Sequence, residues 1–421
     1  MGITIIGNGI AGNSAAMAIR SVNKEVPVTI ISEEAFPLYS NCVLSKKYIS
    51  KEVEREKVFL KSFEDYSKES IETIFGRRVE EIDIRSKRLL LNGKKVIYYD
   101  KLIIATGSKP IIPSIKGVDK ENVFVLKSLN DADKIHNYVG EKVVVVGAGP
   151  LGVEACVALR KRCFKVFLIV RSRLLRRMLD KEVSMIIEKI LKENGIKVLA
   201  EEKLVKFGGT SQVDSIITSK HKIACDAVIL ALGLEPRVEL ARRAGIRIGE
   251  LGGIKVNERM MTSVKDVYAC GDCVEVKDIL SGKDALRASW YNAKQQGRIA
   301  GYNSIGVERS YAGMLGINVI DVFGTYVVSI GYNMDRLKDV DVKVVEEKDK
   351  YHYCRLLVNA NNGVIMGAQF IGEPRDLGVL INAIRRKDSL KKLQEALNNK
   401  DLLFRNPWNY GMHQYVKLGV V

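Results

Sequence analysis

Two Gly-x-Gly-x-x-Gly patterns constrain this chain more than any other feature. Each pattern follows an apolar run with strand character and precedes a helix-like stretch. The first glycine makes a tight turn, the second lets the backbone approach a pyrophosphate, and the third lets the helix pack closely on the strand. The glycines concerned are Gly7, Gly9, Gly12, Gly147, Gly149 and Gly152. Two copies in this context predict two bound dinucleotides, and therefore electron transfer between them.

Length and composition predict a protein of two or three domains. The chain has 421 residues, and a domain typically takes roughly 150. No apolar run reaches the roughly 20 residues that a membrane span needs, and the first strand begins too early for a cleavable leader to precede it. Seven dispersed cysteines favour a reducing cytoplasm over a disulfide framework. We therefore expect a cytoplasmic protein that does not bind membranes.

The chain is basic, with 67 Lys and Arg residues against 50 Asp and Glu residues. The surplus of 17 positive charges favours anionic ligands or an acidic partner protein. A solvated basic surface is the simpler interpretation, so nucleic-acid binding is not expected. A redox-sensing or nucleic-acid-binding flavoprotein is a hypothesis that this charge alone motivates.

An acidic residue after the second strand is the expected partner of an adenosine ribose. The apolar run 26–31 ends just before Glu33 and Glu34. A carboxylate at this point of a dinucleotide-binding unit accepts hydrogen bonds from ribose hydroxyls. We select Glu33, with Glu34 beside it, and an exposed turn acid is the alternative.

The order of strands predicts how the domains are connected. Residues 99–105 form an apolar strand that ends at Thr106 and Gly107, and a near copy at 226–231 ends before Gly233. A third such strand, at 267–269, returns the chain to the first domain, so the second nucleotide domain is inserted into the first. Beyond residue 310, short alternating strands predict an antiparallel sheet with two late helices.

The predicted fold class is therefore α/β, with two doubly wound dinucleotide-binding domains and a C-terminal α+β domain. The expected boundaries are 1–110 with 235–305 for the first domain, 111–234 for the second, and 306–421 for the third.

With these motifs in this order, the chain resembles the FAD- and NAD(P)-dependent pyridine nucleotide-disulfide oxidoreductase superfamily over essentially its full length. The resemblance implies FAD at the first glycine loop and a nicotinamide donor at the second. It implies that Asp272, in the run 268–272, contacts the ribityl or pyrophosphate part of FAD. Thr106, Gly107 and Gly233 lie in the motif turns and are cofactor-binding candidates. The C-terminal domain implies a homodimer.

The segment around Cys42 resembles two subgroups at once. Asn41-Cys42-Val43-Leu44 resembles coenzyme A-disulfide reductases, NADH oxidases and persulfide reductases, which use a single redox cysteine beside the flavin. The following Ser45 and Lys46 resemble ferredoxin, rubredoxin and nitrite reductase flavoproteins, which lack that cysteine. In the latter group the lysine pairs with a glutamate, and Lys46 and Glu154 match those positions. We take Cys42, Lys46 and Glu154 as catalytic candidates.

An arginine cluster after the next strand predicts NADPH. An NADH enzyme normally has an acid there, which accepts the ribose 2′-OH and repels a 2′-phosphate. This chain has Arg171, Arg173, Arg176 and Arg177 instead. Guanidinium groups bind phosphate through paired hydrogen bonds, and Arg171 and Arg177 match the spacing in NADPH-binding glutathione reductases. NADH remains an alternative, with the arginines as a basic surface.

The main functional hypothesis is an FAD-dependent oxidoreductase that takes hydride from NADPH and reduces a disulfide, persulfide or polysulfide through Cys42. One alternative is an NAD(P)H-dependent electron-transfer reductase for ferredoxin, rubredoxin or a nitrite-reductase-type partner. Another is an NAD(P)H oxidase, although Ile10 stands where oxidases and peroxidases carry a histidine. Cys156 and Cys163, seven residues apart, are expected in a helix core. No cysteine or histidine spacing predicts a metal site.

Overall fold

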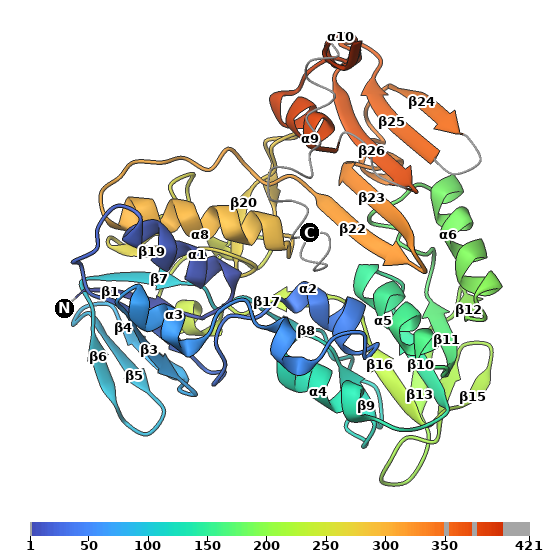
Figure 1. The fold of residues 1–421 in the computed structure, drawn as a ribbon, viewed down its shortest axis with the longest axis horizontal. Helices are drawn as coiled ribbons and strands as arrows, with labels where there is room; N and C mark the ends of the chain where they lie inside the picture. The colour runs from blue at the N-terminus through green and yellow to red at the C-terminus, as the bar shows by residue number, and fades with distance from the viewer. Residues whose placement is uncertain (1, 349–352, 373–376, 399–421) are drawn as a thin grey trace. The chain divides into compact units, whose positions relative to one another are not determined.

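The computed structural model describes residues 2–348, 353–372 and 377–398 (Figure 1). Its chain forms two compact units. The first unit comprises the described residues within 1–40, 59–109 and 234–315, and the second comprises those within 41–58, 110–233 and 316–398.

A five-stranded parallel sheet lies at the centre of the first unit, in the order β19-β7-β1-β2-β3. The strands are β1 (Ile3–Ile6), β2 (Val28–Ser32), β3 (Ile71–Phe75), β7 (Lys101–Ile104) and β19 (Val267–Ala269). All four residues of the central strand β1 are buried, as expected for a strand flanked on both edges. β19 joins β7 in parallel, which confirms the predicted return of the chain to this sheet.

Smaller elements complete the first unit. Two three-stranded sheets have the orders β4-β5-β6 and β18-β20-β21, and β8 pairs with β17. Their bounds are β4 (Val79–Asp83), β5 (Arg88–Leu91), β6 (Val96–Tyr98), β8 (Ser108–Pro110), β17 (Leu234–Pro236), β18 (Ile254–Lys255), β20 (Val274–Lys277) and β21 (Asp284–Ala285). The helices are α1 (Ile10–Arg20), α3 (Phe63–Lys68), α7 (Glu239–Arg243) and α8 (Trp290–Ser304).

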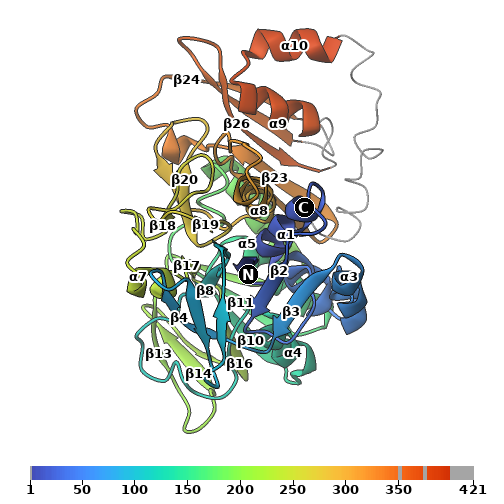
Figure 2. The same cartoon turned by 90° about the vertical axis from the view of Figure 1, so that its left-hand side faces the viewer.

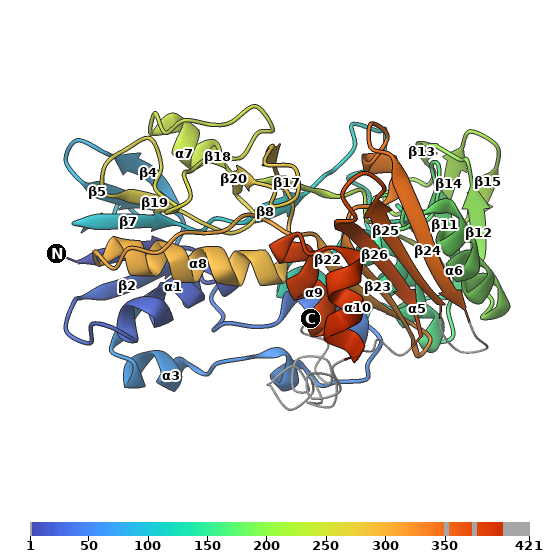
Figure 3. The same cartoon turned by 90° about the horizontal axis from the view of Figure 1, so that it is seen from above.

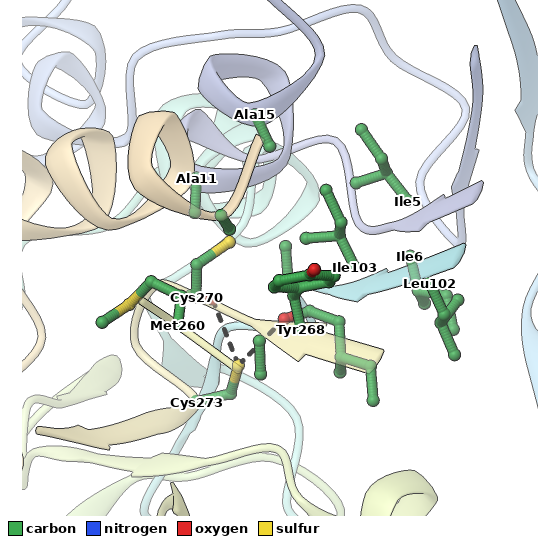
Figure 4. Close-up of a cluster of buried hydrophobic side chains, with 14 of the residues drawn as sticks. Ile5, Ile6, Ala11, Ala15, Leu102, Ile103, Met260, Tyr268, Cys270 and Cys273 are labelled. Carbon is green, nitrogen blue, oxygen red and sulfur yellow. Dashed lines mark hydrogen bonds between the residues drawn. The ribbon is translucent and has the colours of Figure 1, made fainter. Parts of the chain in front are cut away.

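Helices α1 and α8 approach each other unusually closely, and they lie side by side in Figures 1 and 3. A Cβ atom added at Gly297 or Gly301 of α8 would meet the backbone carbonyl oxygen of Ala11 or Ala15 of α1. Two glycines one helical turn apart therefore let the backbones touch. This contact closes the core drawn in Figure 4, in which Ala11 and Ala15 of α1 lie above side chains of the sheet such as Ile103.

A second five-stranded parallel sheet lies in the second unit, in the order β12-β11-β10-β16-β9. The strands are β9 (Val123–Val125), β10 (Lys142–Val146), β11 (Lys165–Val170), β12 (Lys197–Ala200) and β16 (Ala227–Leu230). Its other elements are α4 (Leu129–Asn137), α5 (Pro150–Lys161), α6 (Lys181–Glu193), β13 (Leu204–Phe207), β14 (Ser215–Thr218) and β15 (Lys222–Ala224). The two parallel sheets establish a mixed α/β fold.

The C-terminal part of the second unit is an antiparallel sheet, as the sequence predicted. Its strand order is β22-β23-β26-β25-β24. Its strands are β22 (Ile317–Val322), β23 (Thr325–Gly331), β24 (Val342–Lys348), β25 (Tyr353–Asn359) and β26 (Ile365–Ile371). The helices α9 (Leu377–Arg386) and α10 (Leu390–Asn398) lie next to each other beside it (Figures 2 and 3). A short 3₁₀ turn, η3 (Met334–Arg336), follows β23.

The two units depart from the predicted boundaries in more than one place. The described residues from 316 onward are grouped with the second unit and not as a third domain, and residues 306–315 are grouped with the first. Residues 41–58 also belong to the second unit, although residues 1–110 were predicted to form part of a single domain. The segment holds α2 (Asn41–Val43), the π-helical turn η1 (Leu44–Tyr48) and η2 (Arg55–Val58). Its side chains form hydrogen bonds and ion pairs with α4 and α5 of the second unit. These partners are distant in the sequence, so composition does not predict them. Residues 399–421 of the predicted third domain lie outside the described residues.

Replacing Gly297 with alanine should destabilise the first unit by about 1–3 kcal/mol, because the new methyl group has no room against α1. Gly378→Ala is the matched control, since nothing lies within 4 Å of a Cβ at this glycine of α9. It should be neutral or stabilising by up to about 1 kcal/mol. Urea unfolding followed by circular dichroism measures both, and equal effects of the two substitutions would refute the close-approach argument.

Candidate nucleotide-binding and redox sites

The first glycine loop, between β1 and α1, has the geometry that a bound pyrophosphate requires. Gly7 has φ +112°, and a Cβ there would strike the carbonyl oxygen of Ala105. A Cβ at Gly12 would strike the carbonyl oxygen of Gly7, so the helix can pack on the turn only with glycine here. Nothing lies within 4 Å of a Cβ position at Gly9. The approach to the N–H groups of α1 is therefore open to a phosphate.

The second loop, between β10 and α5, repeats this arrangement. Gly147 has φ +115° and is packed against the carbonyl oxygen of Ala231, while Gly152 is packed against the carbonyl oxygen of Gly147. Gly149 again faces open space. Pro150 occupies the first turn of α5, where its missing N–H costs nothing. Each loop thus fits a dinucleotide, and the equivalence of the two loops extends to individual backbone contacts.

Both ribose candidates lie directly after β2. Glu33 is exposed, and its Oε2 lies 3.0 Å from Nη1 of Arg237. Glu34 accepts a hydrogen bond of 2.9 Å from the hydroxyl of Tyr39. Arg237 also has its backbone N–H on the carbonyl oxygen of Gly107. It therefore links the acid after β2 to the turn after β7.

The Thr106–Gly107 turn and Asp272 also lie in the first unit. The Thr106 hydroxyl donates to the carbonyl oxygen of Arg237 at 2.7 Å, and Gly107 has φ +69°. Asp272 is half-buried, and its Oδ2 accepts a hydrogen bond of 2.8 Å from Ser108 Oγ. Arg237 and Ser108 were not among the residues predicted from the sequence. A lone arginine and a lone serine carry no motif, and only the contacts single them out.

In the second unit, Ser45, Lys46 and Glu154 form one polar cluster. Ser45 Oγ donates to Glu154 Oε2 at 2.5 Å, and Lys46 Nζ lies 3.8 Å from Glu154 Oε1. Lys46 also donates to the carbonyl oxygen of Val319 in β22 at 3.1 Å. The two donors are consecutive residues of the π-helical turn η1, a wider turn that is frequent at functional sites. Cys42, half-buried, stands one turn earlier in α2.

Burial raises the pKa of the Glu154 carboxyl, and the charge of Lys46 and the Ser45 hydrogen bond oppose that rise. Glu154 as a whole is only 8% exposed. A buried carboxylate is tolerated only when it is paired and hydrogen-bonded. The protonation state of Glu154 therefore depends on its two donors, Lys46 and Ser45.

The turn η1 is held in place by an aromatic and ionic contact with α4. The Tyr48 hydroxyl donates to Asp133 Oδ1 at 2.6 Å, and Arg55 pairs with the same carboxylate at 3.0 Å. The Tyr48 ring stacks on His136, with ring centroids 4.4 Å apart. Burial, followed by the hydrogen bond to Asp133, raises the pKa of Tyr48. These contacts fix the orientation of the residues that reach Glu154.

The four arginines after β11 divide into two pairs. Arg173 Nη2 and Arg176 Nε lie 3.1 and 3.4 Å from Asp335 Oδ2. Arg171 and Arg177 are exposed and form no ion pair or side-chain hydrogen bond with any residue that the structure describes. Arg171 and Arg177, which the sequence predicts to bind a 2′-phosphate, are thus the two arginines of the four that do not pair with a carboxylate among the described residues.

The other cysteines have different environments. Cys270 and Cys273 are both fully buried in the core of Figure 4, and Cys273 Sγ is 3.3 Å from the carbonyl oxygen of Cys270. Burial raises the pKa of both thiols. Cys156 is buried as predicted, but the prediction for Cys163 is wrong. α5 ends at Lys161, so Cys163 lies beyond the helix, exposed, with φ +65°.

Gly233 closes the second unit's copy of the strand-and-turn pattern. It has φ +116°, and its carbonyl oxygen accepts from the N–H of Ile111. Among the described residues, no cluster of three or more His, Cys, Asp and Glu side chains could hold a metal ion. No described helix combines the length and apolar character that crossing a bilayer requires.

Known proteins resemble the chain along most of its length. A family model described as pyridine nucleotide-disulphide oxidoreductase matches residues 1–297. An NADH oxidase of Methanocaldococcus jannaschii is 31% identical, over 96% of this chain and 94% of that protein. A CoA-dependent NAD(P)H sulfur oxidoreductase of Pyrococcus abyssi is 31% identical, over 88% and 87%. The solved NAD-dependent persulfide reductase from A. fulgidus has a TM-score of 0.88 at 29% identity, over 94% and 79%.

Removing the Lys46 charge should destabilise the protein in a pH-dependent way. In Lys46→Met, Glu154 remains buried without its cation, so its folded-state pKa rises further above the ordinary 4.5. Because the unfolded chain loses this proton at a lower pH than the folded variant, the variant loses stability relative to wild type as the pH rises from 4.5 through the folded-state pKa. The difference in unfolding free energy between variant and wild type should reach about 3 kcal/mol at about pH 8. Urea unfolding at about pH 5 and about pH 8 measures this difference.

The control is Lys161→Met, which removes the exposed Lys161–Glu52 pair of the same unit. It should cost less than about 1 kcal/mol at either pH. A loss in Lys46→Met that is the same at both pH values would mean that Glu154 does not depend on Lys46.

Proposed function

The chain belongs to the pyridine nucleotide-disulphide oxidoreductase family, and we propose that it takes hydride from NADPH and reduces a disulfide, persulfide or polysulfide through Cys42. It is an oxidoreductase that uses FAD and NAD(P)H. When bound, FAD accepts a hydride and releases two electrons. The observation that carries the proposal is the position of Cys42, one turn before the residues that hold Glu154.

Cys42 supplies the sulfur chemistry. Its thiolate attacks one sulfur of the substrate S–S bond, forms a mixed disulfide and releases the other sulfur as a thiolate. Two electrons then break the mixed disulfide, which restores the Cys42 thiolate and releases the second product thiolate. This step needs the thiolate form of Cys42, because the thiolate and not the thiol is the nucleophile. The buried Cys156, Cys270 and Cys273 lack the access that a substrate disulfide requires.

Glu154 and Lys46 hold charge and geometry for the hydride transfer. The Ser45 hydroxyl fixes one carboxylate oxygen of Glu154, and Lys46 neutralises the other while it is anchored on β22. A buried pair of this kind keeps a defined charge where water is excluded, and fixed charges act more strongly there than in solvent.

The second glycine loop and the arginines after β11 select NADPH. Arg171 and Arg177 are the side chains left to bind a 2′-phosphate, and no acid replaces them at the end of β11. NADH lacks that phosphate and loses those contacts. Glu33, Glu34, Thr106, Gly107 and Asp272 serve FAD in the same proposal, and Gly233 serves the nicotinamide nucleotide.

A second candidate is an electron-transfer reductase for a small acidic redox protein, ferredoxin or rubredoxin in type. The observation that favours it is the Ser45–Lys46–Glu154 cluster, because reductases of this kind carry the lysine and glutamate without a redox cysteine. It predicts turnover with a one-electron protein acceptor and indifference to Cys42. We further propose a homodimer built on the C-terminal sheet and a location in the reducing cytoplasm.

Cys42→Ser should lower the reduction of polysulfide or a disulfide by at least about a hundredfold, because no nucleophilic sulfur remains to form the mixed disulfide. NADPH-dependent dye reduction should stay within about twofold of wild type, because it needs hydride transfer alone. Steady-state assays with both acceptors measure this split.

The matched control is Cys163→Ser, which removes an exposed thiol and should change neither activity. Unchanged sulfur-substrate turnover in Cys42→Ser, together with rapid reduction of a ferredoxin or rubredoxin, would favour the second candidate.

Arg171→Gln and Arg177→Gln should each raise the KM for NADPH by about tenfold to a hundredfold, since each removes a charge-assisted contact with the 2′-phosphate. The KM for NADH should not change. Arg176→Gln removes the same charge from the same loop, but its guanidinium is on Asp335, so its effect should stay under about threefold. Similar effects for all three arginines would point to a diffuse basic surface.

A further inference from the structure

The arginines lie in the loop 171–180, between β11 and α6. Side chains in and just after β23 of the C-terminal sheet donate hydrogen bonds to the backbone of this loop. Ser329 Oγ of β23 donates to the carbonyl oxygen of Met178 at 2.7 Å. Asn333, just after β23, donates to the carbonyl oxygens of Arg176 at 2.8 Å and Leu179 at 3.2 Å. Ser329 and Asn333 are nearly inaccessible, at 3% and 2% exposure. Three carbonyl groups of the loop are thus satisfied from one end of β23.

The loop ends at Asp180, which is held by contacts from the turn η3 and from the strands β25 and β26. Asp180 caps α6 and is 2% exposed. Its Oδ1 accepts from the N–H of Met334 at 2.8 Å, and its Oδ2 lies 3.0 Å from Nε of Arg355 in β25. Its own N–H donates to Oε1 of the fully buried Gln369 in β26 at 2.8 Å. The end of the loop therefore moves only if the C-terminal sheet moves.

Among these residues of the C-terminal part, Asp335 of η3 is the one that contacts arginine side chains of the loop. Its Oδ2 lies within 3.4 Å of both Arg173 and Arg176. Four guanidinium groups within seven residues repel one another, and a single carboxylate relieves two of them. The other two, Arg171 and Arg177, project to solvent.

We propose that Asp335 is a positioning residue for nicotinamide-nucleotide recognition, through which the C-terminal sheet sets the preference for the 2′-phosphate. It holds Arg173 and Arg176 in place, so that the loop presents Arg171 and Arg177 in one conformation. Ordering a loop before the ligand arrives reduces the entropy lost on binding. This inference rests on the proposed use of NADPH. It adds a determinant that lies more than 150 residues beyond the loop, as the 162-residue separation of Arg173 and Asp335 shows.

The test compares Asp335→Asn, Asp335→Glu and wild type as full-length FAD-loaded protein. Asp335→Asn keeps the shape and removes the charge, and it should raise the KM for NADPH by about fivefold, as expected for the loss of two partly exposed ion pairs. The KM for NADH and kcat with either nucleotide should stay within about twofold. Asp335→Glu restores the carboxylate and should return the KM for NADPH to within about twofold of wild type.

A binding measurement separates loop position from turnover. Calorimetry with 2′,5′-ADP and with 5′-AMP isolates the 2′-phosphate contribution to affinity. Asp335→Asn should weaken 2′,5′-ADP by about fivefold and leave 5′-AMP unchanged. Glu188→Gln is the control, because it removes one carboxylate from the Lys192–Glu188 pair on α6 of the same unit. It should affect neither ligand.

Several outcomes would overturn the inference. They are tighter binding of 2′,5′-ADP by Asp335→Asn, equal loss of both ligands, no change in either, and failure of Asp335→Glu to restore binding. The first would mean that Asp335 only repels the phosphate. Failure of the proposed cofactor preference looks different: wild type would not bind 2′,5′-ADP better than 5′-AMP, and Arg171→Gln would change nothing.

Discussion

A buried carboxylate, that of Glu154, is the constraint on which the proposed redox centre depends. A charge at this depth is costly unless donors surround it, and its donors come from a different part of the sequence. Ser45 and Lys46 belong to η1, Glu154 belongs to α5, and Lys46 also reaches the backbone of β22. One carboxylate thereby joins three segments of the second unit. It also explains why residues 41–58 group with this unit and not with the strands that precede them.

The same segment separates Cys42 from the other thiols. Cys156, Cys270 and Cys273 are buried in cores where the neutral thiol is favoured, and burial raises the pKa of each. Cys42 is half-buried at the start of a helical segment, and the cluster around Glu154 follows one turn later. Nucleophilic sulfur chemistry needs access and thiolate character together. Of these four thiols, Cys42 alone is not fully buried, which is why the proposal assigns the sulfur chemistry to it.

The pairing of charges also distinguishes the arginines of this unit from one another. The basic loop after β11 is not a uniform positive patch, because Asp335 engages two of its arginines and leaves two exposed. A C-terminal sheet that is remote in sequence thus shapes a loop beside the second glycine loop. This arrangement is the basis of the proposed role of the sheet in nucleotide recognition, which adds to the proposed dimer interface.

Much of the fold followed from local rules. Gly7, Gly12 and their counterparts Gly147 and Gly152 can be recognised in the sequence because only glycine fits where a helix turns back on its strand. The contacts of Gly12 with Gly7 and of Gly152 with Gly147 are local in the sequence, whereas Gly7 and Gly147 also contact the distant Ala105 and Ala231. The order of motifs already predicted two parallel sheets, the returning strand β19 and the antiparallel C-terminal sheet. The exposed Cys163 was predicted wrongly because α5 ends at Lys161, two residues before the cysteine that was expected on its buried face.

The sequence by itself determined the two glycine loops and the strands around them, and it placed acidic and basic residues at the strand ends. Only the tertiary structure decided which polar and charged side chains contact each other. It joined Ser45 to Glu154 across 109 residues and Arg173 to Asp335 across 162. The physical reason is that backbone sterics are read from neighbouring residues, whereas the choice of an ionic partner depends on which distant segments fold against each other.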